Sequence, residues 1–148
     1  METSGRHQRL AKYLFLVLSI SLVACGEKVI DLDKKGIQTT TYQALPQEVQ
    51  SFIDAHIDSI TVDKDIYFST DPAVKFTYAH SSVPSTGWMD DNRANYHHFF
   101  IDGLHCRMSG TRGQPFILHD KVIYFCDLNL LKDNYKTHPY FKVEAISQ

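Results

Sequence analysis

The sequence predicts an α+β fold, in which one amphipathic helix packs on an antiparallel meander sheet of about six or seven strands. Two patterns lead to this fold class. Apolar side chains recur every three or four residues around residue 50, and beyond that segment they alternate with polar side chains over several short stretches. The 148 residues are enough for a single domain, and an apolar content of 43% is typical of a globular protein.

Residues 1–24 are predicted to be a signal peptide. Three basic residues precede an apolar run from Tyr13 to Ala24. This run is about a dozen residues long, whereas a transmembrane helix needs roughly 20. The segment Leu22-Val23-Ala24-Cys25 resembles the lipobox of bacterial lipoproteins. The resemblance implies that the chain is cut before Cys25, that the Cys25 thiol carries a diacylglyceryl group, and that the new amino group is acylated, for example with palmitate.

The residue after Cys25 bears on the membrane in which such a lipid would sit. In the lipoprotein sorting rule of enteric-type bacteria, an Asp at this position retains the protein in the inner membrane. Gly26 stands there instead. The resemblance therefore implies a lipid-anchored protein of the cell envelope, with the outer membrane favoured over the inner membrane. The alternative is an ordinary secretory signal that happens to contain Cys25.

The charge of the mature chain limits its partners. Cleavage before Cys25 would remove three of the 15 basic residues and one of the 17 acidic residues, which leaves 12 basic and 16 acidic residues. A mildly acidic domain does not suit nucleic acid or a polybasic membrane patch, because both need clustered Lys and Arg. We therefore expect no nucleic-acid partner. Contact with the membrane is expected through the N-terminal lipid, and the remaining partner is a protein or a small ligand.

Residues 25–43 are predicted to form the lipidated N-terminus and a flexible tether, because they are mostly polar and show little periodicity. The alternative is that Val29, Ile30 and Leu32 add an edge strand to the domain. The single α+β domain is expected over residues 44–148.

The helix is predicted to begin at Pro46, because proline is favoured at the first position of helices. His56 lies on its apolar face and is expected to be a core or boundary histidine rather than a ligand. The segment Ala44–His56 resembles the opening helix of PepSY-like domains of bacterial secreted proteins and lipoproteins. The predicted apolar face consists of Val49, Phe52, Ile53, His56, Ile57 and Ile60.

Two hairpins are predicted in the middle of the chain. In the first, Ile66–Phe68 and Val74–Tyr78 pair across Asp71-Pro72. In the second, Asp102-Gly103 is a two-residue turn signal. This turn would place Ile101 opposite Leu104, Phe99 opposite Cys106 and His97 opposite Met108 on one side, and Phe100 with His105 and His98 with Arg107 on the other side.

The C-terminal part is predicted to add a third hairpin and a last strand. Phe116–His119 and Val122–Cys126 flank the turn Asp120-Lys121, and both strands are apolar on both faces, so they are expected to be central in the sheet. Asp127 can cap a short helix that extends to Asn134. Tyr140–Ile146 is the last predicted strand.

The histidine-rich second hairpin is the first candidate site. Strand alternation places His97 and Cys106 on one face of the ribbon and His98 and His105 on the other, so the four cannot converge on one metal ion. We therefore expect no metal and no cofactor. A dyad of Ser81 with its neighbour His80 is disfavoured for the same reason, since a nucleophile and its base must converge in space.

The segment 81–95 is the second candidate site, because a connection of this length without a strand pattern is often functional. It is predicted to contact a partner, although Trp88 could instead cover the edge of the sheet. The predicted contact residues are Trp88, Met89, Asp90, Asp91 and Arg93.

Cys106 and Cys126 remain after acylation of Cys25, in a compartment that permits disulfides. Both lie in apolar strands, which suits a disulfide and equally suits two buried thiols. In a simple meander their strands are separated by Phe116–His119, which disfavours a bond.

The function predicted from these patterns is that of a membrane-anchored bacterial lipoprotein with a small periplasmic or surface-exposed domain that binds a partner rather than transforming a substrate. Candidates are a component of an envelope complex, an inhibitor or immunity-type protein, and a module that holds a ligand. The alternative is a small envelope hydrolase with a site built from dispersed residues such as His98, His105 and Arg107. A concave site with convergent polar groups would favour the hydrolase.

Overall fold

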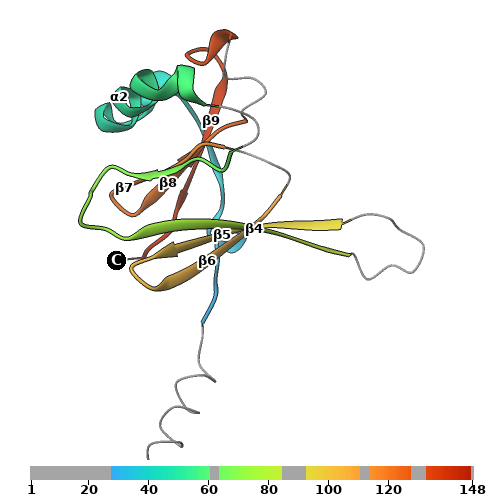
Figure 1. Ribbon diagram of the computed structural model, residues 1–148. Helices are drawn as coiled ribbons and strands as arrows, with labels where there is room; N and C mark the ends of the chain where they lie inside the picture. The colour runs from blue at the N-terminus through green and yellow to red at the C-terminus, as the bar shows by residue number, and fades with distance from the viewer. Residues whose placement is uncertain (1–27, 61–63, 85–92, 111–113, 128–132, 148) are drawn as a thin grey trace, which may run out of the picture.

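A computed structural model describes residues 28–60, 64–84, 93–110, 114–127 and 133–147. Within these ranges the fold is α+β and consists of three layers: a helix, a five-stranded sheet B, and a four-stranded sheet A (Figure 1). The helix α2 (Gln47–His56) lies on one face of sheet B, and sheet A packs against the other face. No helix in the described ranges is long and apolar enough to cross a bilayer.

Sheet A contains three antiparallel strands and one short parallel strand at its edge. Its order is β1-β6-β5-β4, and β1 runs parallel to β6. Its strands are β1 (Ile30–Asp31), β4 (Phe76–Pro84), β5 (Arg93–Ile101) and β6 (Leu104–Ser109).

Sheet B has the order β2-β9-β8-β7-β3, and its edge strand β3 runs parallel to β7. The other neighbouring pairs are antiparallel. Its strands are β2 (Gln38–Thr41), β3 (Tyr67–Ser69), β7 (Phe116–His119), β8 (Val122–Phe125) and β9 (Pro139–Glu144).

The expected single meander is therefore wrong, and the reason lies in the central strands of sheet B. Phe116 and Leu118 point toward sheet A, whereas Ile117, between them, points toward α2. One helix could cover only one of these two apolar faces. Sheet A covers the second face, which is why the strands divide into two sheets.

Helix α2 agrees with the predicted apolar face. It starts after Pro46 and is followed by a 3-10 turn, Ile57–Ser59. Val49, Ile53 and Ile60 are buried, and the other three predicted positions, Phe52, His56 and Ile57, are half-buried. The side chains of Val49 and Ile53 pack on sheet B and form a core between the helix and the sheet. The other buried residues of this core are Tyr42, Leu45, Ile117, Tyr124, Cys126 and Tyr140.

The second predicted hairpin is confirmed with its register, and the third is confirmed about its predicted turn, although its second strand, β8, ends at Phe125. Ile101 pairs with Leu104 and Phe99 with Cys106 across a turn in which Asp102 and Gly103 have φ of 47° and 84°. His119 pairs with Val122 across Asp120-Lys121. The strand after His138 is also confirmed as β9, although it begins at Pro139 and ends at Glu144. Most of the expected short helix after Asp127 lies outside the described residues.

The first predicted hairpin is wrong. β3 belongs to sheet B and pairs with β7, whereas β4 belongs to sheet A and pairs with β5. Thr70 N donates to the carbonyl of Leu118 at 3.0 Å, which extends the contact with sheet B just before the chain turns. The turn at Asp71-Pro72 therefore carries the chain from one sheet to the other rather than back along the same sheet.

The expected tether also differs from the structure. Ile30 and Asp31 pair in parallel with β6, and Leu32 is fully buried between the sheets. Its amide donates to the carbonyl of Arg107 at 2.8 Å. Further along, β2 pairs with β9. The apolar side chains of this segment are thus needed in the core, and the domain begins earlier than residue 44.

The expected loop over residues 81–95 is shorter than predicted. β4 continues to Pro84, and β5 begins at Arg93. The segment 85–92, with Trp88, Met89, Asp90 and Asp91, lies outside the described residues, as does Cys25.

Candidate functional site

The face of sheet A that points away from sheet B carries the candidate site. Phe99, Ile101, Cys106 and Met108 fill the core between the sheets, so the alternate residues of β5 and β6 point the other way. We call this surface the outer face, and define it by Ser81, Tyr96, His98, Phe100, His105 and Arg107.

A chain of two hydrogen bonds runs across three strands of the outer face. Ser81 Oγ lies 2.7 Å from His98 Nε2, and His98 Nδ1 lies 2.9 Å from His105 Nε2. With the His98 proton on Nδ1, the ring accepts from the Ser81 hydroxyl and donates to His105. Ser81 comes from β4, His98 from β5 and His105 from β6, so the cluster exists only when these three strands pair.

The surroundings of His98 keep its ring neutral. Partial burial lowers its pKa, and positive charge on His105 and on Arg107 lowers it further. Arg107 lies directly opposite His98 in the strand register, and its guanidinium lies 4.9 Å from the centre of the Tyr96 ring. A neutral imidazole with a free electron pair toward a hydroxyl can act as a general base.

Aromatic rings surround the cluster. Phe100 is 37% exposed and stacks on His105, with 4.6 Å between the ring centres. Tyr96 lies opposite Ser81, and Ala79, opposite His98, is small and exposed. The outer face therefore combines a hydroxyl, two imidazoles and a guanidinium with exposed aromatic surface.

His97, next to His98, has a different environment. It points into the space between the sheets, is 2% exposed, and its Nδ1 lies 2.8 Å from the hydroxyl of Tyr78. Burial is the main cause and charge on His80 the next, and together they lower the pKa of His97 to about 4. The predicted separation of His97 and Cys106 from His98 and His105 is thus present in the structure.

Sequence reasoning found part of this cluster and missed its hydroxyl. It grouped His98, His105 and Arg107, which the structure brings together. The sequence places Ser81 beside His80 only and predicts a loop for the segment that contains it. The cross-strand partner of Ser81 follows from the pairing of β4 with β5, which was not predicted.

The strands β4 and β5 form an arm beyond the rest of sheet A (Figure 1). β6 pairs with β5 only as far as Tyr96, whereas β4 follows β5 to Arg93. Val83 on this arm is 44% exposed. Because the segment 85–92 joins Pro84 to Arg93, the predicted partner-binding residues Trp88 to Asp91 are attached to the end of the arm, and Arg93 is the first residue of β5.

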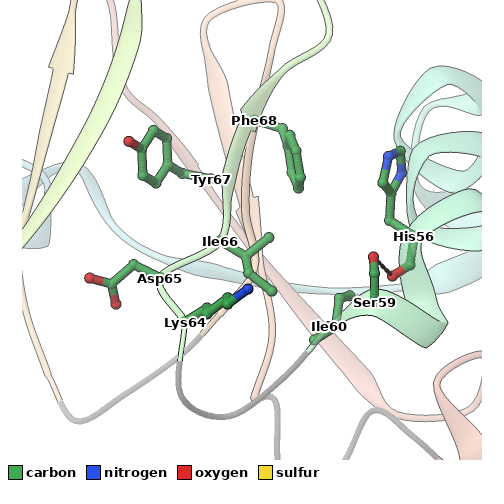
Figure 2. Close-up of a pocket in the computed structure, with 8 residues that line it drawn as sticks. All are labelled: His56, Ser59, Ile60, Lys64, Asp65, Ile66, Tyr67 and Phe68. Carbon is green, nitrogen blue, oxygen red and sulfur yellow. Dashed lines mark hydrogen bonds between the residues drawn. The ribbon is translucent and has the colours of Figure 1, made fainter.

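A cavity of about 400 Å³ lies between the end of α2 and β3. Figure 2 shows Phe68 pointing toward His56, while Tyr67 and Asp65 point to the other side of the strand. The His56 ring stacks on the Phe52 ring with 4.1 Å between the ring centres, and its Nδ1 lies 2.9 Å from the Phe52 carbonyl oxygen. His56 is half-buried and is therefore a boundary histidine. The cavity is lined by His56, Ser59, Ile60, Lys64, Asp65, Ile66, Tyr67 and Phe68.

Cys106 and Cys126 are free, buried thiols. Cys106 lies between the two sheets, and Cys126 lies between sheet B and α2. Burial raises the pKa of both thiols, that of Cys126 to about 12. Among the described residues, no three side chains of the types that bind metal ions come together.

No family model, no curated protein and no solved structure matches this chain.

Proposed function

We propose that the protein is a bacterial lipoprotein, anchored to the cell envelope through Cys25, whose α+β domain binds a protein or a small ligand. The lipobox-like segment Leu22-Val23-Ala24-Cys25 supports the anchor, and Gly26 supports the outer membrane as its location. The first described strand, β1, starts at Ile30. Only a few residues would then separate the lipid from the folded domain, which favours a domain held close to the membrane.

The observation that carries the binding role is the β4–β5 arm. A two-stranded extension costs ordering entropy and buries little apolar surface, so stability alone does not explain it. The arm is joined to the segment 85–92, which contains Trp88 and Met89, and Trp and Met are enriched at binding interfaces. We infer that this segment makes the main partner contact. The cavity beside His56 is where a small ligand would be held instead.

The anchor is tested by mass spectrometry of the mature N-terminus. We expect an acylated Cys25 as the first residue in wild-type cells. Cys25→Ala should leave an unprocessed precursor, because the thiol that receives the lipid is gone. A mature protein that begins at another residue, or a processed Cys25→Ala variant, would contradict the anchor without affecting the proposal for the arm.

The partner contact is tested by cross-linking the full-length lipidated protein in intact envelopes. Replacing residues 85–92 with a short Gly-containing turn should abolish cross-linking to the protein that the wild-type chain captures. The unfolding transition of the variant should remain unchanged. Trp88→Ala alone should cost about 2 kcal/mol of binding, or roughly a 30-fold loss of affinity. Leu104→Ala is the matched control, because Leu104 is 43% exposed at the opposite end of β5 and β6.

A different result would move the contact to another surface. If Trp88→Ala lowers the melting temperature and leaves binding unchanged, Trp88 covers the sheet edge and is not an anchor. The partner contact would then be assigned to the outer face, where Phe100, His98, His105 and Arg107 are the next residues to test.

A further inference from the structure

We propose that Ser81 is a nucleophile that accepts acyl groups from small carboxylic esters, with His98 as its general base and His105 as the residue that positions His98. Two consecutive hydrogen bonds carry this proposal. Ser81 Oγ lies 2.7 Å from His98 Nε2, and His98 Nδ1 lies 2.9 Å from His105 Nε2. The sequence predicts, as the alternative function, a hydrolase built from His98, His105 and Arg107. Ser81 is the nucleophile that this prediction lacks.

The arrangement follows the general logic of activated nucleophiles. A serine hydroxyl is weakly nucleophilic until an adjacent base takes its proton, and the base must be held by a third group. Here one nitrogen of His98 faces the hydroxyl and the other faces His105, so the ring is held from both sides. His105 is held in turn, because Phe100 stacks on it. The lowered pKa of His98 keeps the base neutral at pH 7.

The proposed reaction has two balanced steps. Ser81 Oγ bonds to the ester carbonyl carbon while its proton moves to His98 Nε2. The bond from this carbon to the alkoxy oxygen then breaks, and His98 returns the proton to the departing alcohol. Water then bonds to the carbonyl carbon of the acyl-Ser81 ester while one of its protons moves to His98 Nε2. The bond from this carbon to Ser81 Oγ breaks, His98 returns the proton to Ser81 Oγ, and a carboxylic acid is released. No oxidant, metal or cofactor enters either step.

The substrate class follows from the shape and charge of the site. The guanidinium of Arg107 lies 4.9 Å from the centre of the ring of Tyr96, the residue opposite Ser81, so we assign Arg107 the stabilisation of the developing oxyanion. One guanidinium on an open sheet face gives limited stabilisation, which suits an ester, because an alkoxide leaves more readily than an amine. The exposed ring of Phe100 and the ring of Tyr96 offer an apolar surface for the rest of the substrate. We therefore expect small, unhindered esters and not peptides.

The first test uses an alkyl fluorophosphonate on the full-length protein in detergent, followed by peptide mass spectrometry. Ser81 Oγ should bond to phosphorus and expel fluoride. The adduct should be absent in Ser81→Ala and present in Ser82→Ala, which changes the next residue of the same strand. His98→Gln should slow labelling about 100-fold or more. Absence of an adduct on Ser81, or equal rates in wild type and His98→Gln, would overturn the proposal.

The second test separates Ser81 from simple imidazole catalysis. Wild type should hydrolyse 4-nitrophenyl acetate with an initial burst from acylation, and Ser81→Ala should lose the burst. If Ser81→Ala hydrolyses the ester at the wild-type rate, the imidazoles act alone and Ser81 is not the nucleophile. His105→Gln should shift the pH at which labelling is half-maximal, which a purely structural role would not do. Melting temperatures of all variants verify that each is folded.

Discussion

Adjacent residues on one strand of this protein have unlike chemistry. His97 lies between the two sheets and is bonded to the Tyr78 hydroxyl, whereas His98 lies on the outer face and is bonded to Ser81 and His105. Strand alternation predicts this separation from the sequence alone. The hydrogen-bond partners were not predictable in the same way, because Tyr78 and Ser81 come from β4, and nothing in the sequence near β5 shows that β4 is its neighbour.

His97 should make the stability of the protein depend on pH. Its pKa is about 4 in the folded protein against an ordinary value of 6.5, so between these values the unfolded chain binds more protons. Stability therefore falls as the pH decreases from about 6.5 toward 4. At pH 4.5 the contribution of His97 to the loss should be about 2 kcal/mol relative to pH 7. Urea unfolding at both pH values measures it.

A matched pair of variants assigns this pH dependence to His97. His97→Gln keeps a polar partner for the Tyr78 hydroxyl but cannot ionise in this range, so the difference between pH 7 and pH 4.5 should shrink. His80→Gln changes an exposed ring whose centre lies 5.7 Å from that of His97, and it should retain most of the difference. An unchanged pH dependence in His97→Gln would show that other groups cause the acid destabilisation.

Secondary-structure elements were predictable where a local turn sets their register. The turns at Asp102-Gly103 and Asp120-Lys121 each place two residues at positive φ, and the strands that they join pair as expected. The parallel pairs β1–β6 and β3–β7 join segments that are far apart in the sequence, and no turn signals them. This difference explains why two hairpins were predicted correctly while the first hairpin and the tether were not.

In the turns Asp120-Lys121 and Asp102-Gly103, we expect introducing and removing a glycine to change stability in opposite directions. Lys121 has φ of 69°, which is strained for a side chain with a Cβ, so Lys121→Gly should raise the free energy of unfolding by about 0.5–1 kcal/mol. Gly103 occupies the equivalent position of the other turn with φ of 84°, and a Cβ there would meet no atom within 4 Å. Gly103→Ala should therefore lower stability by about 1 kcal/mol through backbone strain alone.

Urea unfolding of both variants at pH 7 measures this pair of effects. A loss of stability in Lys121→Gly would mean that the Lys121 side chain makes contacts worth more than the strain. The backbone carbonyl of Lys121 accepts from the amide of Ala145 at 2.8 Å, and this bond is kept in the variant.

At the scale of the whole molecule, sheet B is shared by two cores. Alternate residues of β7 enter the core against sheet A and the core against α2, so neither core can lose its packing without exposing one face of the same sheet. The three-layer order was not predictable from composition, although the strands that are apolar on both faces already required a cover on each side. We expect the two cores to unfold together.

The two cysteines report on the two cores separately. Cys106 is fully buried between the sheets, and Cys126 is 2% exposed on the α2 side of sheet B. In the native protein neither thiol should react with iodoacetamide at pH 8, because both are buried and burial raises both pKa values. In urea, pulsed alkylation and peptide mass spectrometry should show both thiols becoming reactive at the same midpoint, without any reducing agent. If Cys126 reacts at lower urea than Cys106, the α2 layer opens alone. A disulfide-linked peptide containing both residues would contradict their placement in separate cores.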